Sequence, residues 1–144
     1  MTKPTVFAVS AGLLMFALAP QVRADDECSV ADLRGDYSFI LSGTIVSGAV
    51  PVVAAGKTTY HGDGNADGVI WVNLNGMQYF SNWDATYTLS PLAPCTFTKT
   101  LTLKGPGLPG AVFNFAITAG DDFRELRFVD TDMGKAITGT ARKQ

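Results

Sequence analysis

The chain has 144 residues, of which 47% are hydrophobic and 17% charged, and its net charge at pH 7 is -2. This length is enough for about one small domain with one modest core. The weakly acidic balance argues against nucleic acid or an anionic membrane surface as a partner.

The first element in the chain is a predicted signal peptide, residues 1–24. Lys3 provides the positive start, residues 5–19 form an apolar run, and Ala24 ends a segment of the kind that signal peptidase cleaves. The run of 15 residues is shorter than the ~20 that cross a membrane, and no later segment approaches that length. We therefore expect a secreted or periplasmic protein that begins at Asp25, with no membrane span after cleavage.

The predicted mature part, residues 25–144, is expected to be a single domain. Without Lys3 and Arg23 it keeps 9 basic residues against 13 acidic ones, a net charge of -4. Its two cysteines are Cys28 and Cys95. Thiols of exported chains meet an oxidising compartment, so we expect a disulfide bond between them.

Apolar and polar residues alternate along this part with the period of two that is typical of β-strands. Tyr37, Phe39 and Leu41, for example, point to one face, whereas Ser38 and Ser42 point to the other. Turn residues, among them Asn75-Gly76, separate the runs. The pattern predicts about eight strands, near residues 36–46, 52–61, 68–74, 77–89, 95–104, 111–119, 123–130 and 135–142, after at most a short helical turn at residues 28–34.

Short turns make consecutive strands antiparallel, so the expected class is all-β. A meander of eight strands with one apolar face hides its edges most completely by closing into an up-and-down β-barrel. A β-sandwich of two sheets is the alternative, because the same alternation would suit it.

The start of the first predicted strand, Leu33-Arg34-Gly35-Asp36-Tyr37, resembles the L-x-G-x-aromatic opening of the lipocalins and related calycins, with tyrosine where the family usually has tryptophan. Arg142 is similar in place to the family's arginine that packs over this ring. The chain departs from the family in its short length and in the absence of a C-terminal helix pattern. It also resembles small secreted bacterial barrels of unknown function and the compact barrel of allene oxide cyclases. These resemblances imply a pocket at one end of a barrel.

The stretch HGDGNADG at residues 61–68 contains the D-x-N-x-D-G letters of a calcium-binding loop. Asp63, Asn65 and Asp67 match the first three ligand positions, but Leu74 stands where the loop needs a glutamate. The flanking residues favour strands rather than helices. We expect a hairpin turn, with a weak calcium site as the alternative.

Catalytic and metal-binding patterns are few. His61 is the single histidine, and no G-x-S-x-G nucleophile elbow occurs in the chain. One histidine and two paired cysteines do not make a zinc site. We therefore expect no metal and no cofactor, and His61 is interpreted as a rim or surface residue.

Strict alternation places Lys99 on the same face as Phe97 and Leu101. A lysine inside a barrel needs a carboxylate, an anionic ligand or a route to solvent. It could hold the carboxylate of a ligand, unless a bulge or the strand end lets it reach outward. The residues predicted to line the interior and bind a ligand are Tyr37, Phe39, Tyr79, Trp83, Phe97, Lys99, Phe113 and Phe115.

Three hypotheses about function follow from this interior. The first is a secreted barrel that binds a hydrophobic small molecule. The second is a cyclase or isomerase that acts on an apolar substrate in the same cavity. The third is a non-catalytic envelope or host-contact protein whose barrel is a filled core, because eight strands leave room for side chains or for one small ligand. The sequence does not decide whether the protein is an enzyme.

Overall fold

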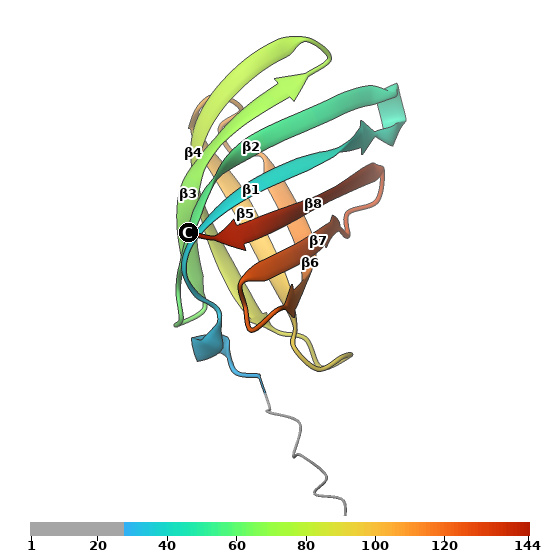
Figure 1. Cartoon of the computed structure of the whole chain (residues 1–144). Helices are drawn as coiled ribbons and strands as arrows, with labels where there is room; N and C mark the ends of the chain where they lie inside the picture. The colour runs from blue at the N-terminus through green and yellow to red at the C-terminus, as the bar shows by residue number, and fades with distance from the viewer. Residues whose placement is uncertain (1–27) are drawn as a thin grey trace, which may run out of the picture.

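The structure is a computed structural model that describes residues 28–144, and these residues form a closed antiparallel β-barrel (Figure 1). Each strand pairs with the next, and β1 also pairs with β8, so the sheet has no free edge. The prediction of an all-β up-and-down barrel is confirmed. The strands are β1 (Arg34–Ile45), β2 (Val50–His61), β3 (Asn65–Leu74), β4 (Met77–Leu89), β5 (Thr96–Pro106), β6 (Val112–Gly120), β7 (Glu125–Asp130) and β8 (Lys135–Lys143).

The two ends of the barrel differ. The 3₁₀ turn η1 (Val30–Asp32) lies at the end where β1 begins, together with the β2–β3, β4–β5 and β6–β7 connections (Figure 1). The opposite end is formed by the β1–β2 turn, which contains the 3₁₀ turn η2 (Val46–Gly48), and by the β3–β4, β5–β6 and β7–β8 connections. We call the first the closed end and the second the open end.

Aromatic side chains fill the interior at the closed end. Tyr37, Tyr60 and Tyr87 pack edge to face, with ring centroids 5.5 Å and 5.2 Å apart. The Tyr87 hydroxyl donates a hydrogen bond of 2.7 Å to the carbonyl oxygen of Leu33 and accepts one of 2.9 Å from the backbone N–H of Gly62. A buried hydroxyl with partners on two different segments fixes the Tyr87 ring in place.

Cross-strand pairs explain how large rings fit against the barrel wall. Trp83 in β4 stands directly opposite Gly68 in β3, and a methyl group on Gly68 would come within 2.6 Å of the indole ring. The absence of a side chain lets the ring lie flat on the backbone, as in other curved sheets. Phe39 and Phe128 lie over Gly56 and Gly139 in the same way.

The predicted disulfide between Cys28 and Cys95 is present, with the two Cα atoms 5.1 Å apart. It links the segment before η1 to the residue that precedes β5, so it ties the N-terminal segment across the closed end. Such a bond is typical of an oxidising compartment. The predicted signal peptide, residues 1–24, lies outside the described residues.

The L-x-G-x-aromatic segment enters the barrel as its pattern suggests, since Leu33 and Tyr37 are fully buried. Gly35 has a φ of +109°, a conformation that favours glycine. The expected role of Arg142 is wrong. Its side chain points outward to Glu125, at 3.8 Å, because residue 142 lies on the outer face of β8, and the ammonium group of Lys143 lies 5.9 Å from the centre of the Tyr37 ring instead.

The HGDGNADG stretch forms a turn between two strands, as expected. The Asp63 carboxylate accepts a hydrogen bond of 2.9 Å from the backbone N–H of Asn65, and Asp67 contacts the His61 ring at 2.6 Å. The strand after this turn begins at Asn65, three residues earlier than predicted, because residues 65–68 pair with β4. Within residues 28–144 no group of three or more His, Cys, Asp or Glu side chains comes together as a possible metal site.

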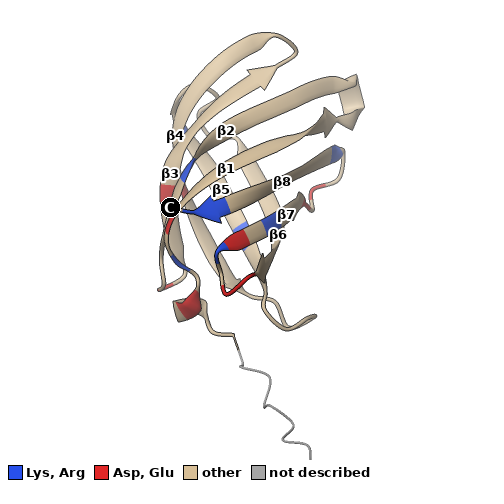
Figure 2. Ribbon diagram, in the orientation of Figure 1, with Lys and Arg blue, Asp and Glu red and all other residues tan. Residues whose placement is uncertain are grey.

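Charged residues are unevenly spread over the barrel. Residues 38–56 and 68–83 contain none, so the β1–β2 and β3–β4 hairpins are uncharged at the open end (Figure 2). Large apolar side chains are exposed there, among them Val46, Val53 and Met77. No helix in the described part of the chain has the length and apolar character needed to cross a membrane.

Candidate functional site

A cavity of about 390 Å³ occupies the half of the barrel interior next to the open end. Its wall comes from all the strands except β4, and from Leu108 and Ala111 in the β5–β6 connection. The volume falls within the range of small-molecule sites, which are also concave and mostly apolar. The interior is therefore filled with side chains at its closed end and hollow at the other.

Four of the eight residues predicted to bind a ligand line this cavity: Phe39, Lys99, Phe113 and Phe115. The ring of Phe115 contacts that of Phe128 edge to face, with centroids 5.4 Å apart, and Phe113 stacks against Phe115 at 6.4 Å. Phe128, which was not in the predicted set, also lines the cavity. These rings form one side of an apolar wall.

The other four predicted residues lie elsewhere. Three of them are buried but do not line the cavity, because they pack in the filled part of the interior: Tyr37, Trp83 and Phe97. Tyr79 is half-buried and lies against the β5–β6 connection, where Gly107 donates a backbone hydrogen bond of 2.8 Å to the neighbouring Phe80. This connection folds over the wall and contributes Leu108 to the cavity in place of Tyr79.

Lys99 is the polar centre of the cavity. Its side chain is buried, with 7% of its surface exposed, and its ammonium group lies 4.3 Å from the centre of the Trp83 ring and 4.8 Å from that of Tyr60. Cationic groups are attracted to such ring faces. The Nζ atom also donates a hydrogen bond of 3.2 Å to the Tyr60 hydroxyl. Lys99 therefore points into the barrel interior, and the alternative that it reaches outward is wrong.

No acidic side chain compensates this lysine: in the described residues its amine takes part in no salt bridge. Burial in apolar surroundings disfavours the charged form and lowers the pKa of Lys99 to about 7. The pKa of Tyr60 is raised by burial, with smaller effects from Tyr37 and Tyr87, so its hydroxyl stays neutral. At neutral pH the cavity floor thus presents an amine that changes its charge and a hydroxyl that does not.

Sequence reasoning missed Tyr60 as a site residue. It lies on the inner face of β2, two residues after Thr58, which also lines the cavity. The alternation of buried Thr58 and Tyr60 with exposed Lys57 and His61 was a usable signal. His61 accordingly points outward and is not part of the cavity.

A second lysine, Lys135, lies at the mouth of the cavity. Unlike Lys99 it has a partner, since its ammonium group contacts the Asp132 carboxylate at 2.7 Å. It also donates a hydrogen bond to the Val112 carbonyl oxygen and lies 4.3 Å from the centre of the Phe113 ring. Asp132 is held in turn by Asn114, whose side-chain amide donates a hydrogen bond of 2.7 Å, and these contacts lower its pKa. The charges of Lys135 and Asp132 therefore compensate each other at the mouth.

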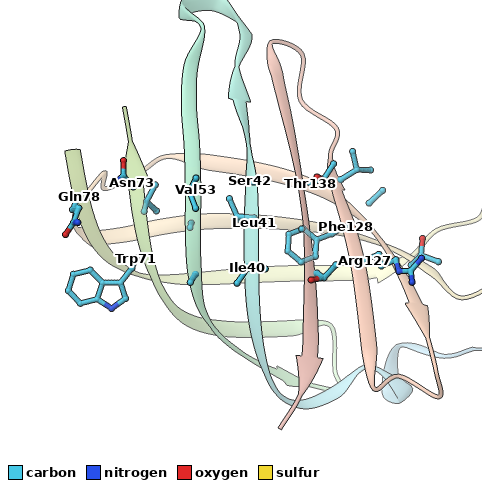
Figure 3. Close-up of a pocket in the computed structure, with 18 residues that line it drawn as sticks. Ile40, Leu41, Ser42, Val53, Trp71, Asn73, Gln78, Arg127, Phe128 and Thr138 are labelled. Atoms are coloured by element: carbon cyan, nitrogen blue, oxygen red, sulfur yellow. The ribbon is translucent and has the colours of Figure 1, made fainter. Parts of the chain in front are cut away.

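A larger and more open hollow, of about 1020 Å³, crosses the outside of the barrel (Figure 3). Trp71 and Gln78 lie at one end of it and Arg127 at the other, with Ile40, Ser42 and Val53 between them. Arg127 is the single charged residue among those that line it. Among the described residues that line this hollow there is no pair of titratable groups and no buried polar side chain. The interior cavity is therefore the better candidate site.

No family model and no curated protein matches the sequence. Among solved structures, the redesigned β-barrel mFAP1 bound to DFHBI is similar in fold, with a TM-score of 0.58 and 16% identity over 80% of this chain and 98% of that one. A second redesigned barrel, b11L5F_LGL, aligns with a TM-score of 0.57 and 16% identity over 81% and 95% of the two chains. A fluorescence-activating β-barrel designed de novo aligns with a TM-score of 0.54 and 11% identity over 81% and 99%. These similarities show the fold, and the resemblance to lipocalins stays a prediction.

Proposed function

We propose that this protein binds a hydrophobic small molecule inside the barrel, with an oxygen atom of the ligand facing Lys99. The observation on which this depends is the cavity of about 390 Å³, apolar on nearly all sides, with one uncompensated amine at its floor. A buried amine without an acid is costly unless a ligand supplies the missing acceptor. A carboxylic acid with an apolar body has the complementary shape and charge.

The open end supports this proposal as a route of entry. The β1–β2 and β3–β4 hairpins have no charged residue near the mouth, and the two charges of Lys135 and Asp132 neutralise each other. An apolar molecule would therefore pass no unpaired charge of these residues before it reaches Lys99. The closed end is a less suitable route, because Leu33 and the tyrosine rings fill it.

The barrels of similar fold give further support. The redesigned barrel mFAP1 is bound to DFHBI, so a small barrel of this architecture is able to hold a compact organic molecule. The filled-core hypothesis is less well supported, since Tyr37, Tyr87 and Phe97 fill the closed half of the interior, whereas the other half contains the cavity. We further propose a location outside the cytoplasm, based on the signal-like residues 1–24 and on the Cys28–Cys95 disulfide.

Calorimetry with decanoate at pH 6.5 tests this function. We expect one decanoate per chain, and we expect Lys99→Met to weaken its binding by about 1 to 3 kcal/mol because a charged contact is lost. Lys104→Met is the matched control, since Lys104 is half exposed and pairs with Asp84 on the outer surface. Equal affinity of Lys99→Met and the wild type would contradict the proposed orientation, and no binding by any of the proteins would contradict the function.

A further inference from the structure

Lys99 differs from the other lysines of the barrel in what surrounds its amine. Lys104 and Lys135 have carboxylate partners at 3.2 Å and 2.7 Å, and Lys57 and Lys143 are exposed to solvent. Lys99 instead lies in the cavity wall with a neutral hydroxyl and two aromatic faces around it. In the described residues, none of the groups around this amine is a carboxylate that would pair with its charged form.

We propose that Lys99 captures apolar aldehydes covalently, as a Schiff base formed inside the cavity. This inference depends on the proposed function, because the aldehyde must first enter the barrel. It names a second class of ligand for the same site, in which the oxygen atom facing Lys99 belongs to a carbonyl group rather than a carboxylate.

The chemistry needs no reagent other than the aldehyde. The lone pair of Lys99 Nζ attacks the carbonyl carbon, a C–N bond forms, and the C=O π electrons move to the oxygen atom, which takes a proton to give a carbinolamine. The carbinolamine then loses its oxygen as water. The two hydrogens of this water come from the amine, and a C=N bond remains. The reaction is therefore a condensation without oxidation or reduction.

The surroundings of Lys99 suit these steps. A desolvated lysine in a hydrophobic pocket keeps a larger fraction of neutral, nucleophilic amine than one in water, in line with its lowered pKa. The Tyr60 hydroxyl, 3.2 Å from Nζ, is close enough to hydrogen-bond the oxygen of the carbinolamine. The faces of Trp83 and Tyr60 favour the positive charge of a protonated Schiff base. An apolar cavity also keeps bulk water from hydrolysing it.

The experiment is reductive trapping with nonanal. Full-length protein is incubated with nonanal and sodium cyanoborohydride at pH 7.5, and the modified lysines are identified by peptide mass spectrometry. Lysines with an ordinary pKa are about one part in a thousand neutral at this pH, so they serve as slow internal references. Lys99→Arg, which keeps the charge but has no primary amine, is compared with Lys104→Arg on the outer surface.

We expect Lys99 to be labelled at least about tenfold faster than the exposed lysines, and decanoate to protect it. In Lys104→Arg, Lys99 should be labelled as fast as in the wild type. In Lys99→Arg, only the slow reaction of the surface lysines should remain. If nonanal displaces decanoate but the adducts are spread over surface lysines alone, the covalent inference is overturned and the binding function stands. If neither nonanal nor decanoate binds, both proposals fail.

Discussion

The amine of Lys99 donates a hydrogen bond of 3.2 Å to the hydroxyl of Tyr60, although the two residues are 39 positions apart in the sequence and belong to strands that do not pair. This contact crosses the interior of the barrel and closes the floor of the cavity. On its closed-end side the rings of Tyr37, Tyr87 and Phe97 are buried and packed, and on its open-end side lies the cavity. The pair therefore marks the boundary between the structural half and the candidate binding half of the molecule.

The first prediction concerns the pH dependence of decanoate binding. A fatty carboxylate is ionised above about pH 5, and Lys99 is protonated below its pKa of about 7, so the ion pair forms best between these values. Affinity measured by calorimetry should fall above pH 7, by up to about tenfold per pH unit, since Lys99 must take up a proton for the ion pair to form. In Lys99→Met this fall should disappear. A profile that is flat from pH 6 to 9 in the wild type would contradict the ionic contact.

The second prediction concerns the stability of the empty barrel. The pKa of Lys99 is depressed on folding from 10.5 to about 7, so between these values the unfolded chain binds more protons than the folded one. The free energy of unfolding should therefore rise with pH in this window, by up to about 1.4 kcal/mol per unit from this residue alone. The cost of burying the charge is greatest at and below pH 7, so Lys99→Met should be most stabilising there.

Urea unfolding of the wild type, Lys99→Met and Lys104→Met at pH 6.5, 8 and 9.5 measures this effect. The difference between Lys99→Met and the wild type should shrink as pH rises, whereas Lys104→Met should stay within about 0.5 kcal/mol of the wild type throughout. A difference that does not depend on pH would mean that the buried amine keeps its ordinary pKa.

The third prediction concerns the disulfide. Cys28 and Cys95 are separated by 67 residues, and a cross-link over a loop of this length contributes on the order of 4 kcal/mol in the chain-entropy model. Both residues lie outside the strands, so Cys28→Ser with Cys95→Ser should lower the Tm without removing the β-signal in circular dichroism. Loss of strand content at room temperature would show instead that closure of the barrel depends on the bond.

The fourth prediction is that calcium does not stabilise the fold. Asp67 is already paired with His61, and Asp63 caps its own turn, so one carboxylate oxygen of each is engaged within the hairpin. Thermal unfolding in millimolar calcium and in chelator should give the same Tm. A rise of several degrees with calcium, abolished by Asp67→Ala, would restore the calcium-loop interpretation.

The fold could be predicted from the sequence because the alternation of apolar and polar residues has the same period as the strand backbone. Strand ends were less accurate where glycine or turn residues interrupt the pattern. β7 begins at Glu125, two residues later than predicted, because Asp121, Asp122 and Phe123 adopt positive φ values in the preceding turn. β3 begins earlier, since backbone pairing with β4 continues through Gly68 despite its weak strand propensity.

The site was predictable only in part. Alternation identifies which residues face inward, and it placed Lys99, Phe39, Phe113 and Phe115 in the interior. It does not tell how far along the axis of the barrel each one lies, so it could not separate the rings of the filled floor from those of the cavity wall. The contact between Lys99 and Tyr60 could not be predicted from the sequence either, because it joins strands that are not neighbours in the sheet.

Fluorescence of the buried tryptophan tests the central claim most directly. Trp71 is 60% exposed on the outer surface, so in Trp71→Phe the remaining emission comes from Trp83, whose ring lies 4.3 Å from the Lys99 amine. Titration of this variant with decanoate should change the Trp83 emission, saturate at one molecule per chain, and lose most of its response when Lys99→Met is added. An emission that stays constant up to millimolar decanoate, in a barrel that remains folded, would contradict a ligand site in the interior.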